Sequence, residues 1–164
     1  MTSASTKLSV VGKEAMLELG AQLARQLMPG TLVYLEGDLG MGKTTLAQGI
    51  VQSLGHRGAV KSPTYTIVEP YELPAGTVYH FDLYRLDDPE ELEFMGVRDY
   101  FDGSSICLIE WPQRGAGILP PADLVITIEA ECEGRLVELE PHTILGEDLV
   151  NMMVKKTVGW SGVK

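Results

Sequence analysis

One segment of the chain combines the residue types that bind nucleotide phosphates. Residues 37–44 read Gly-Asp-Leu-Gly-Met-Gly-Lys-Thr, a complete G-x-x-x-x-G-K-[ST] pattern, which is the Walker A motif. Its glycines let the backbone turn so that successive N–H groups form a nest for phosphate oxygens. In such a nest Lys43 is expected to contact the β- and γ-phosphates, and the Thr44 hydroxyl to bind Mg²⁺. The motif therefore predicts a nucleotide site.

The segments on either side of the motif favour this site over a glycine-rich turn. Thr31–Leu35 is an apolar, β-prone run that predicts a buried strand. Lys43–Leu54 predicts a helix, because its apolar residues recur at spacings of three and four. Strand, loop and helix in this order place free N–H groups of the helix at the phosphates. The predicted nucleotide contacts are Asp38, Leu39, Gly40, Met41, Gly42, Lys43, Thr44 and Thr45.

Hydrolysis or transfer of a phosphoryl group needs carboxylates outside the loop, and two are suitably placed. Glu110 ends the apolar run 105–110, and Asp82 ends the apolar run 78–81. The carboxyl ends of strands face the ligand crevice in α/β sheets, so Glu110 is predicted to be the Walker B-like acid. The alternative for Glu110 is a strand-end side chain that points to solvent. For Asp82, spacing alone leaves a site role and a structural role equally open.

Other residues near these positions also allow two interpretations. Residues 62–64, Ser-Pro-Thr, stand where a switch loop would follow the P-loop helix, although spacing alone favours a proline turn. Arg85 could neutralise phosphate charge, but such an arginine more often pairs with nearby acids, and Asp87 and Asp88 are available. His80 is expected to be a structural histidine on its strand.

Length and composition indicate one soluble domain. The chain has 164 residues, of which 45% are apolar and 22% charged, as in globular proteins. No run approaches the ~20 apolar residues of a membrane span, and the first residues lack the apolar core of a signal peptide. We therefore expect a cytoplasmic protein with no membrane partner. Neither Cys107 nor Cys132 has a second Cys or His at the spacing of metal ligands. Cys107 lies in an apolar run, which predicts a core position.

The charge of the chain argues against direct binding of nucleic acid. Asp and Glu total 23 and Lys and Arg only 13, which gives a net charge of −10. Proteins that hold nucleic acid alone normally present a basic face, because phosphate contacts dominate their affinity. If RNA is involved, another protein is expected to hold it.

The order of the predicted elements favours an α/β fold. Helices and strands alternate early in the chain and strands dominate late, so we expect a P-loop NTPase-like three-layer domain whose mixed, largely parallel central sheet carries added antiparallel strands. We expect one domain over residues 1–164, with 1–6 disordered and about 143–164 forming a C-terminal extension or helix. The predicted helices are 13–28, 43–54, one starting at 88–94 and one near 145–154, and the remaining predicted strands are 65–69, 77–82, 123–129 and 135–140.

Several short motifs together resemble those of a known family. The matching segments are Gly-Asp-Leu-Gly-Met-Gly-Lys-Thr-Thr (37–45), Ser-Pro-Thr-Tyr (62–65), His-Phe-Asp-Leu-Tyr-Arg (80–85), Gly-Val-Arg-Asp-Tyr (96–100) and Ile-Glu-Trp-Pro (109–112). In order and spacing they resemble the TsaE (YjeE) family, small P-loop ATPases of bacterial threonylcarbamoyladenosine synthesis in tRNA. The resemblance covers roughly residues 7–140, and the joint set is far more specific than the P-loop alone.

The resemblance implies ATP binding and slow, Mg²⁺-dependent hydrolysis coupled to two partner proteins, TsaD and TsaB. In that system TsaD and its partners place a threonylcarbamoyl group on the adenosine beside the anticodon, and TsaE acts on the TsaB–TsaD assembly so that it turns over repeatedly. The protein would then contact tRNA only indirectly, through that assembly, in agreement with its acidic composition.

The resemblance also implies roles for individual residues. Lys43 and Thr44 would hold phosphate and Mg²⁺, and Glu110 would be the Walker B-like acid. Asp82 would be the second acid, which either places water or completes the metal shell. Thr64 would belong to a switch-like loop, and Trp111 would flank the site.

Three other functions remain as alternatives. A small-molecule P-loop kinase shares the size and the Walker A spacing, but it usually brings an Arg-rich lid, whereas Arg85, Arg98 and Arg114 are scattered. A non-catalytic nucleotide-dependent switch module is not separated from an ATPase by sequence. A GTPase is disfavoured because the guanine-reading Asn-Lys-x-Asp segment is absent. For an adenine base, Arg135 is a candidate neighbour.

Overall fold

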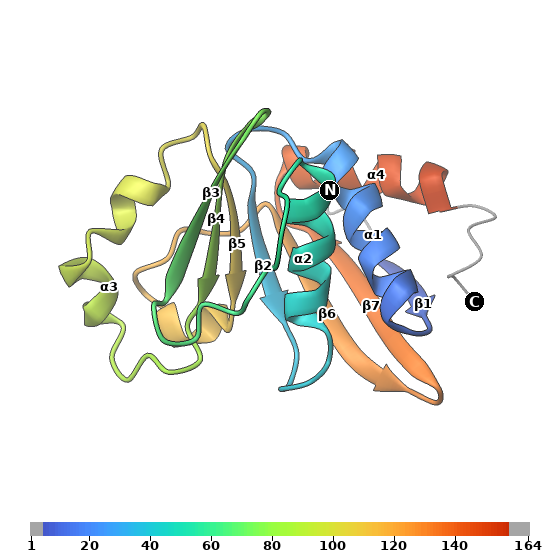
Figure 1. Cartoon of the computed structure of the whole chain (residues 1–164), viewed down its shortest axis with the longest axis horizontal. Helices are drawn as coiled ribbons and strands as arrows, with labels where there is room; N and C mark the ends of the chain where they lie inside the picture. Colours follow the sequence, from blue (N-terminus) through green and yellow to red (C-terminus); the bar gives the residue numbers. More distant parts are fainter. Residues whose placement is uncertain (1–4, 158–164) are drawn as a thin grey trace.

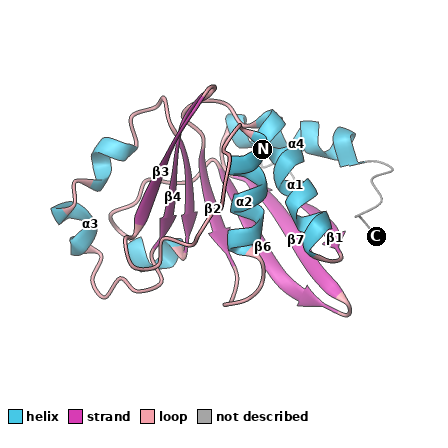
Figure 2. Cartoon of the chain, viewed as in Figure 1, coloured by secondary structure: helices cyan, strands magenta, loops and turns pink. Residues whose placement is uncertain are grey.

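The chain folds around one mixed β-sheet, and the computed structural model describes residues 5–157. Within that range the sheet has seven strands in the order β1-β7-β6-β2-β5-β4-β3 (Figures 1 and 2). The strands are β1 (Thr6–Val10), β2 (Leu32–Glu36), β3 (Val68–Leu73), β4 (Gly76–Asp82), β5 (Ile106–Glu110), β6 (Leu124–Glu131) and β7 (Gly134–Pro141). The helices are α1 (Lys13–Gln26), α2 (Lys43–Ser53), α3 (Glu90–Phe94) and α4 (Ile144–Thr157), with short 3₁₀ helices η1 (Val97–Tyr100) and η2 (Pro112–Gly115).

The centre of the sheet is parallel and its margins are antiparallel. Strand β2 pairs in parallel with β5 and β6, and β5 pairs in parallel with β4. The antiparallel pairs are β3 with β4, β6 with β7 and β7 with β1. This topology confirms the predicted P-loop NTPase-like α/β class. All four parallel strands end at the lower edge of the sheet in Figure 1, so their carboxyl ends share one edge.

Apolar side chains alternate along the strands and create two cores. In β2, Val33 and Leu35 join the core that lies under α1, α2 and α4, whereas Leu32 faces the opposite core. That second core receives Leu92 of α3 and Val97 of η1. The period-two alternation of a strand thus produces a layer on each face of the sheet (Figure 1).

Helices α1 and α2 approach each other closely through glycines. A Cβ atom on Gly49 would lie 2.4 Å from the carbonyl oxygen of Leu17, and one on Gly20 would lie 2.6 Å from that of Leu46. Only a residue without a side chain fits at these two positions. The close contact holds α2, whose first turn follows the Walker A loop, firmly against the rest of the helical layer.

One predicted strand lies in a different place. The sequence predicts a strand at Tyr65–Glu69, but β3 runs from Val68 to Leu73, and Ile67 has a left-handed φ of 71°. Pro70 lies within β3, which is an edge strand, where a missing N–H costs no ladder hydrogen bond.

The two ends of the described chain add elements to the sheet and the helical layer. Strand β1 was not predicted; Thr6, placed by the prediction in the disordered segment 1–6, pairs with Leu139 of β7, and residues 1–4 lie outside the described residues. Helix α4 packs on β7 and α1, and residues 158–164 of the predicted C-terminal extension also lie outside. Over residues 5–157, no helix is long and apolar enough to cross a membrane.

Candidate functional site

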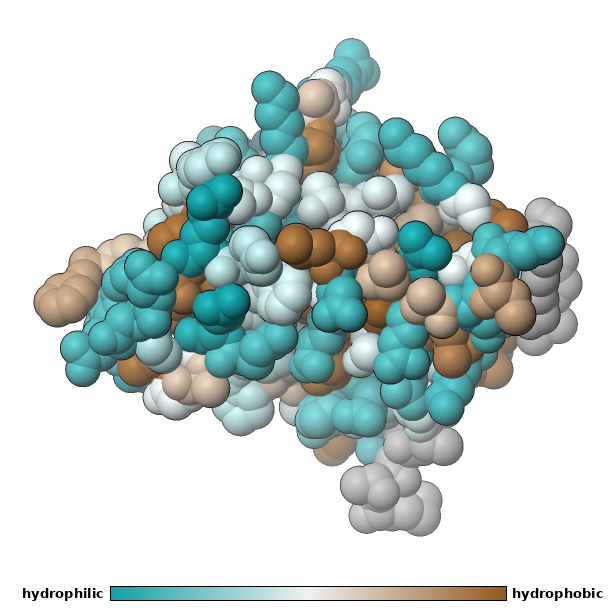
Figure 3. Space-filling view, turned by 90° about the horizontal axis from the view of Figure 1, so that it is seen from below, coloured by the Kyte–Doolittle hydropathy of each residue, from teal (hydrophilic) through white to brown (hydrophobic). Residues whose placement is uncertain are grey.

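The Walker A loop joins the end of β2 to the start of α2, at the edge where the parallel strands end. Gly37, Gly40 and Gly42 have φ values of 150°, 78° and 114°, a region that side-chain-bearing residues rarely adopt. A Cβ on Gly37 would also lie 2.6 Å from the carbonyl oxygen of Ile128. The glycines are therefore required by the turn itself. Figure 3 views the molecule from this end, where hydrophilic side chains cover most of the surface.

Lys43 is held inside the loop that it belongs to. Its side chain is only 5% exposed, and Nζ donates hydrogen bonds to the carbonyl oxygens of Gly37 and Asp38. The ammonium also lies 4.4 Å from the centre of the Trp111 ring. Burial lowers the pKa of Lys43, and the nearby charges of Glu110, Asp82 and Asp38 oppose that shift. The result is a cation with few solvent contacts at the floor of the loop.

Glu110, the predicted Walker B-like acid, contacts the motif across the sheet. The Thr44 hydroxyl lies 3.1 Å from Oε2 of Glu110, a residue 66 positions away in the sequence. Glu110 is 3% exposed, so the alternative of a solvent-facing strand end is wrong. Strand register pairs Glu110 with Asp82, which places both carboxylates side by side at the ends of β5 and β4.

Asp82 is tied to the segment that precedes β3. Its Oδ2 atom accepts hydrogen bonds from Ser62 Oγ at 2.5 Å and Thr64 Oγ1 at 3.1 Å. Its Oδ1 atom accepts the backbone N–H of Tyr84 at 3.0 Å. Residues 62–64 are therefore more than the proline turn that spacing favours, because both hydroxyls contact the candidate catalytic acid. Asp82 is 4% exposed, so these bonds satisfy a nearly buried carboxylate.

The donor set beside the P-loop suits a hard cation. It consists of oxygen atoms only: the Thr44 hydroxyl and the carboxylates of Glu110 and Asp82. Among residues 5–157, no group of three or more His, Cys, Asp or Glu residues could by itself hold a metal ion. Mg²⁺ commonly binds through one or two protein oxygens together with phosphate oxygens and water. Thr44 and Glu110, together with the nearby Asp82, therefore form a partial set of oxygen ligands of the kind that suits Mg²⁺.

Two residues of the motif 80–85 show which contacts they make. His80 is fully buried on its strand, as expected of a structural histidine, and its Nε2 atom lies 2.6 Å from Oε2 of Glu110, so it contacts a candidate site residue. The alternation of β4, which puts His80 and Asp82 on one face, was the available signal. The expected pairing of Arg85 with neighbouring acids is wrong: its guanidinium lies 4.5 Å from the ring centre of Tyr65 and donates to its hydroxyl.

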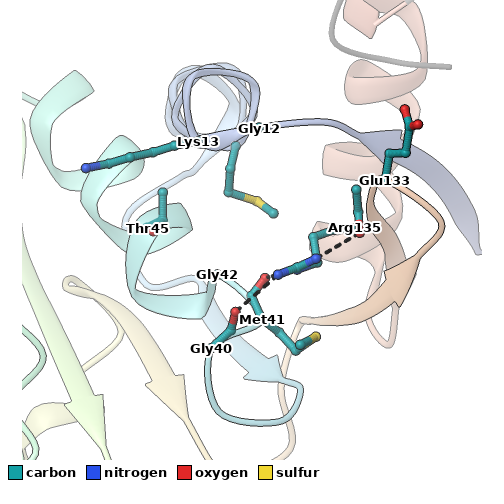
Figure 4. A pocket seen from close by; sticks show the side chains of 10 residues that line it. Gly12, Lys13, Gly40, Met41, Gly42, Thr45, Glu133 and Arg135 are labelled. Carbon is teal, nitrogen blue, oxygen red and sulfur yellow. Dashed lines mark hydrogen bonds between the residues drawn. The ribbon is translucent and has the colours of Figure 1, made fainter.

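A hollow adjoins the loop on the side of α1 and the β6–β7 hairpin (Figure 4). Arg135, at the start of β7, donates from Nε to the carbonyl oxygen of Met41 at 3.1 Å and from a terminal nitrogen to that of Gly40 at 3.4 Å. These bonds fasten the guanidinium to the loop. The cavity has a volume of about 330 Å³, and its lining includes Gly12, Lys13, Met16, Thr45 and Glu133.

Taken together, the strand–loop–helix unit, the mixed sheet and the acids at its carboxyl edge define a P-loop NTPase-like α/β protein. A family model described as "Threonylcarbamoyl adenosine biosynthesis protein TsaE" matches residues 10–137. The chain belongs to the TsaE family.

Individual relatives agree with this assignment. A protein of Haemophilus influenzae named "tRNA threonylcarbamoyladenosine biosynthesis protein TsaE" is 52% identical over 142 residues, which cover 84% of this chain and 90% of the relative. A Nostoc protein of the same name is 35% identical over 150 residues, or 88% and 91% of the two chains. The crystal structure of YdiB from Bacillus subtilis superposes with a TM-score of 0.80 at 30% identity, covering 95% of this chain and 97% of YdiB.

Proposed function

We propose that this protein binds ATP with Mg²⁺ and hydrolyses it slowly, as a component of threonylcarbamoyladenosine modification of tRNA that acts on the TsaB–TsaD assembly. One observation carries the proposal: Thr44 of the Walker A motif and Glu110 of a distant strand meet at 3.1 Å, with Asp82 in register beside Glu110. This arrangement resembles the one in which P-loop NTPases hold Mg²⁺, between the hydroxyl of the loop and a carboxylate on a neighbouring strand.

The chemistry follows from the positions of these side chains. The N–H groups of the loop and of the first turn of α2 would hold the phosphate oxygens, and Lys43 would exchange its bonds to backbone carbonyls for bonds to phosphate. Bound Mg²⁺ would neutralise charge on the phosphate oxygens. Thr44 and Glu110 would hold the ion or its waters, and Asp82 would orient the attacking water.

The cavity beside Arg135 is the proposed place of the adenine base. It borders the loop and the first turn of α2 through Thr45, so a nucleotide whose phosphates lie in the loop can extend into it. The guanidinium of Arg135 is fixed by Gly40 and Met41, and such a fixed plane can stack on a purine at little entropic cost.

The partners in the proposal follow from the family and from charge. A net charge of −10 disfavours independent binding of tRNA, so contact with tRNA would be indirect, through the TsaB–TsaD assembly. A cytoplasmic location would match such a role. The arginine contacts disfavour a kinase, because Arg85 contacts Tyr65 and Arg98 pairs with Glu93, so both guanidinium groups are bound to neighbouring side chains.

The test is Mg²⁺-dependent release of phosphate from ATP by the purified protein, alone and with TsaB and TsaD added. We expect slow turnover that changes when both partners are present. Transfer of phosphate to a small acceptor in place of water would favour the kinase. Tight ATP binding with no turnover, with or without the partners, would favour the non-catalytic switch.

A further inference from the structure

His80 has a bonding pattern that packing alone does not explain. It is fully buried in β4, and its Nδ1 atom has no hydrogen-bond partner among the described residues. An unpaired buried polar atom destabilises the folded protein, because it has lost its hydrogen bonds to water. An apolar side chain of similar size could fill the same volume without that cost, so the ring is better explained by what its other nitrogen does.

That other nitrogen contacts the Walker B-like acid. His80 Nε2 lies 2.6 Å from Oε2 of Glu110, and the hydrogen of this bond lies on Nε2 because a carboxylate oxygen accepts. The same Oε2 atom accepts the Thr44 hydroxyl at 3.1 Å, and Oε1 lies 3.3 Å from that hydroxyl. Glu110 is thus held from both sides, by the P-loop and by β4.

We propose that His80 is a positioning residue that holds the Glu110 carboxylate toward Thr44, ready to receive Mg²⁺ or its waters; this inference rests on the proposed function. A glutamate side chain has three rotatable bonds, and one fixed oxygen removes most of its alternative orientations. Hydrogen bonds from a second residue to a metal ligand typically change metal affinity or activity 10–100-fold when lost. His80 would therefore act on a bound metal through Glu110, with which its Nε2 atom forms a hydrogen bond.

Three variants separate this role from simple packing. His80→Leu removes the donor and keeps the bulk. His80→Gln places an amide N–H near the position of Nε2, whereas His80→Asn keeps a polar group that is too short to reach Glu110. The matched control is His142→Leu, because His142 Nε2 lies 2.6 Å from a carboxylate oxygen of Glu140, on the surface and away from the loop.

The readout is the ratio of ADP dissociation constants measured by calorimetry in EDTA and in Mg²⁺, with thermal unfolding recorded for each variant. The Leu and Asn variants should lose about 10-fold or more of the Mg²⁺-dependent gain while keeping their affinity for ADP in EDTA. The Gln variant should stay within a few-fold of the parent, and so should His142→Leu. If the Leu variant does not fold, the comparison of Asn with Gln decides.

Three results would contradict the inference in distinguishable ways, and a fourth would contradict the proposed function. An unchanged Mg²⁺-dependent gain in the Leu and Asn variants would show that Glu110 needs no help from His80. Equal losses in the Gln and Asn variants would assign the ring to packing. Equal losses of ADP affinity with and without Mg²⁺ would place the effect outside the metal site. A parent protein that binds no ADP, or gains nothing from Mg²⁺, would instead refute the proposed function.

Discussion

Lys43 carries its charge into a part of the protein that is nearly closed to solvent. Two backbone carbonyls and the Trp111 ring surround the ammonium, and burial lowers its pKa. A lysine held in this way is already at the floor of the loop, so the side chain loses little further freedom when a phosphate arrives. Its effect on affinity should therefore be large.

We expect Lys43→Ala to weaken ADP and ATP binding on the order of 100-fold, because loss of one partner of a buried charge pair costs about 2–5 kcal/mol. Isothermal titration calorimetry measures this directly. Lys61→Ala is the control, since Lys61 is an exposed lysine after α2 and outside the loop. Unchanged nucleotide affinity in Lys43→Ala would refute the phosphate-binding role of the motif.

Asp82 should matter for turnover more than for binding. Asp82→Asn removes the charge but keeps an oxygen that can accept the Tyr84 N–H. We expect the rate of ATP hydrolysis to fall on the order of 100-fold or more, as for lost general-base or water-positioning groups, with ADP affinity within a few-fold of the parent.

The matched substitution for that experiment is Asp88→Asn, at the exposed start of α3, where the side chain accepts the N–H of Glu90. It should hydrolyse ATP at the parent rate. Normal turnover by Asp82→Asn would reduce Asp82 to a structural acid that holds the hydroxyls of Ser62 and Thr64.

At the scale of the elements, the packing of α1 on α2 decides where the Walker A loop stands. Gly49→Ala should destabilise the protein by about 1–3 kcal/mol, because the new Cβ would lie 2.4 Å from the carbonyl oxygen of Leu17. In an open helix the same change stabilises by up to about 1 kcal/mol, so the sign of the effect is informative. Urea unfolding measures it.

The control in the same helix is Ser53→Ala, at an exposed position, which should change stability by less than about 0.5 kcal/mol. If Gly49→Ala proved as stable as the parent, α1 and α2 would have to move apart at little cost in free energy. The packing of α1 on α2 would then not fix the position of the Walker A loop.

For the molecule as a whole, the two cysteines report on folding in opposite ways. Cys107 is buried in β5, and burial, with a smaller effect of Asp102, raises the pKa of its thiol to about 12. Because the thiolate is the reactive form and unfolded cysteine has a pKa near 8.5, Cys107 should react at pH 8 only after global unfolding. Cys132 is exposed in the β6–β7 turn and should react in the native protein.

Mass spectrometry after brief treatment with iodoacetamide at pH 8 tests this difference. One modified thiol is expected without denaturant and two in concentrated urea, and Cys132→Ser should show none and one. Fast modification of Cys107 in the native protein would mean that the central sheet opens locally.

Local signals in the sequence predict a large part of the fold and of the candidate site. The Walker A motif, the strand before it and the helix after it are neighbours in the chain, so residue types and spacing identify them together. The order of helices and strands indicates the α/β class for the same reason, and apolar strand ends mark Asp82 and Glu110 as candidates. Each of these features depends on residues within about one element of each other.

Contacts between distant segments were decided only by the tertiary structure. The bond of Thr44 to Glu110, the two hydroxyls on Asp82 and the histidine behind Glu110 depend on which strands pair and in which register. Pairing of this kind joins residues far apart in the chain, and no local pattern encodes it. The prediction missed β1 and placed β3 too early in the sequence for a related reason. Both are edge strands with solvent on one side, so their apolar pattern is weak. The local pattern thus predicts a phosphate site and two candidate acids, whereas the pairing of the strands decided that Glu110 contacts Thr44 and that His80 contacts Glu110.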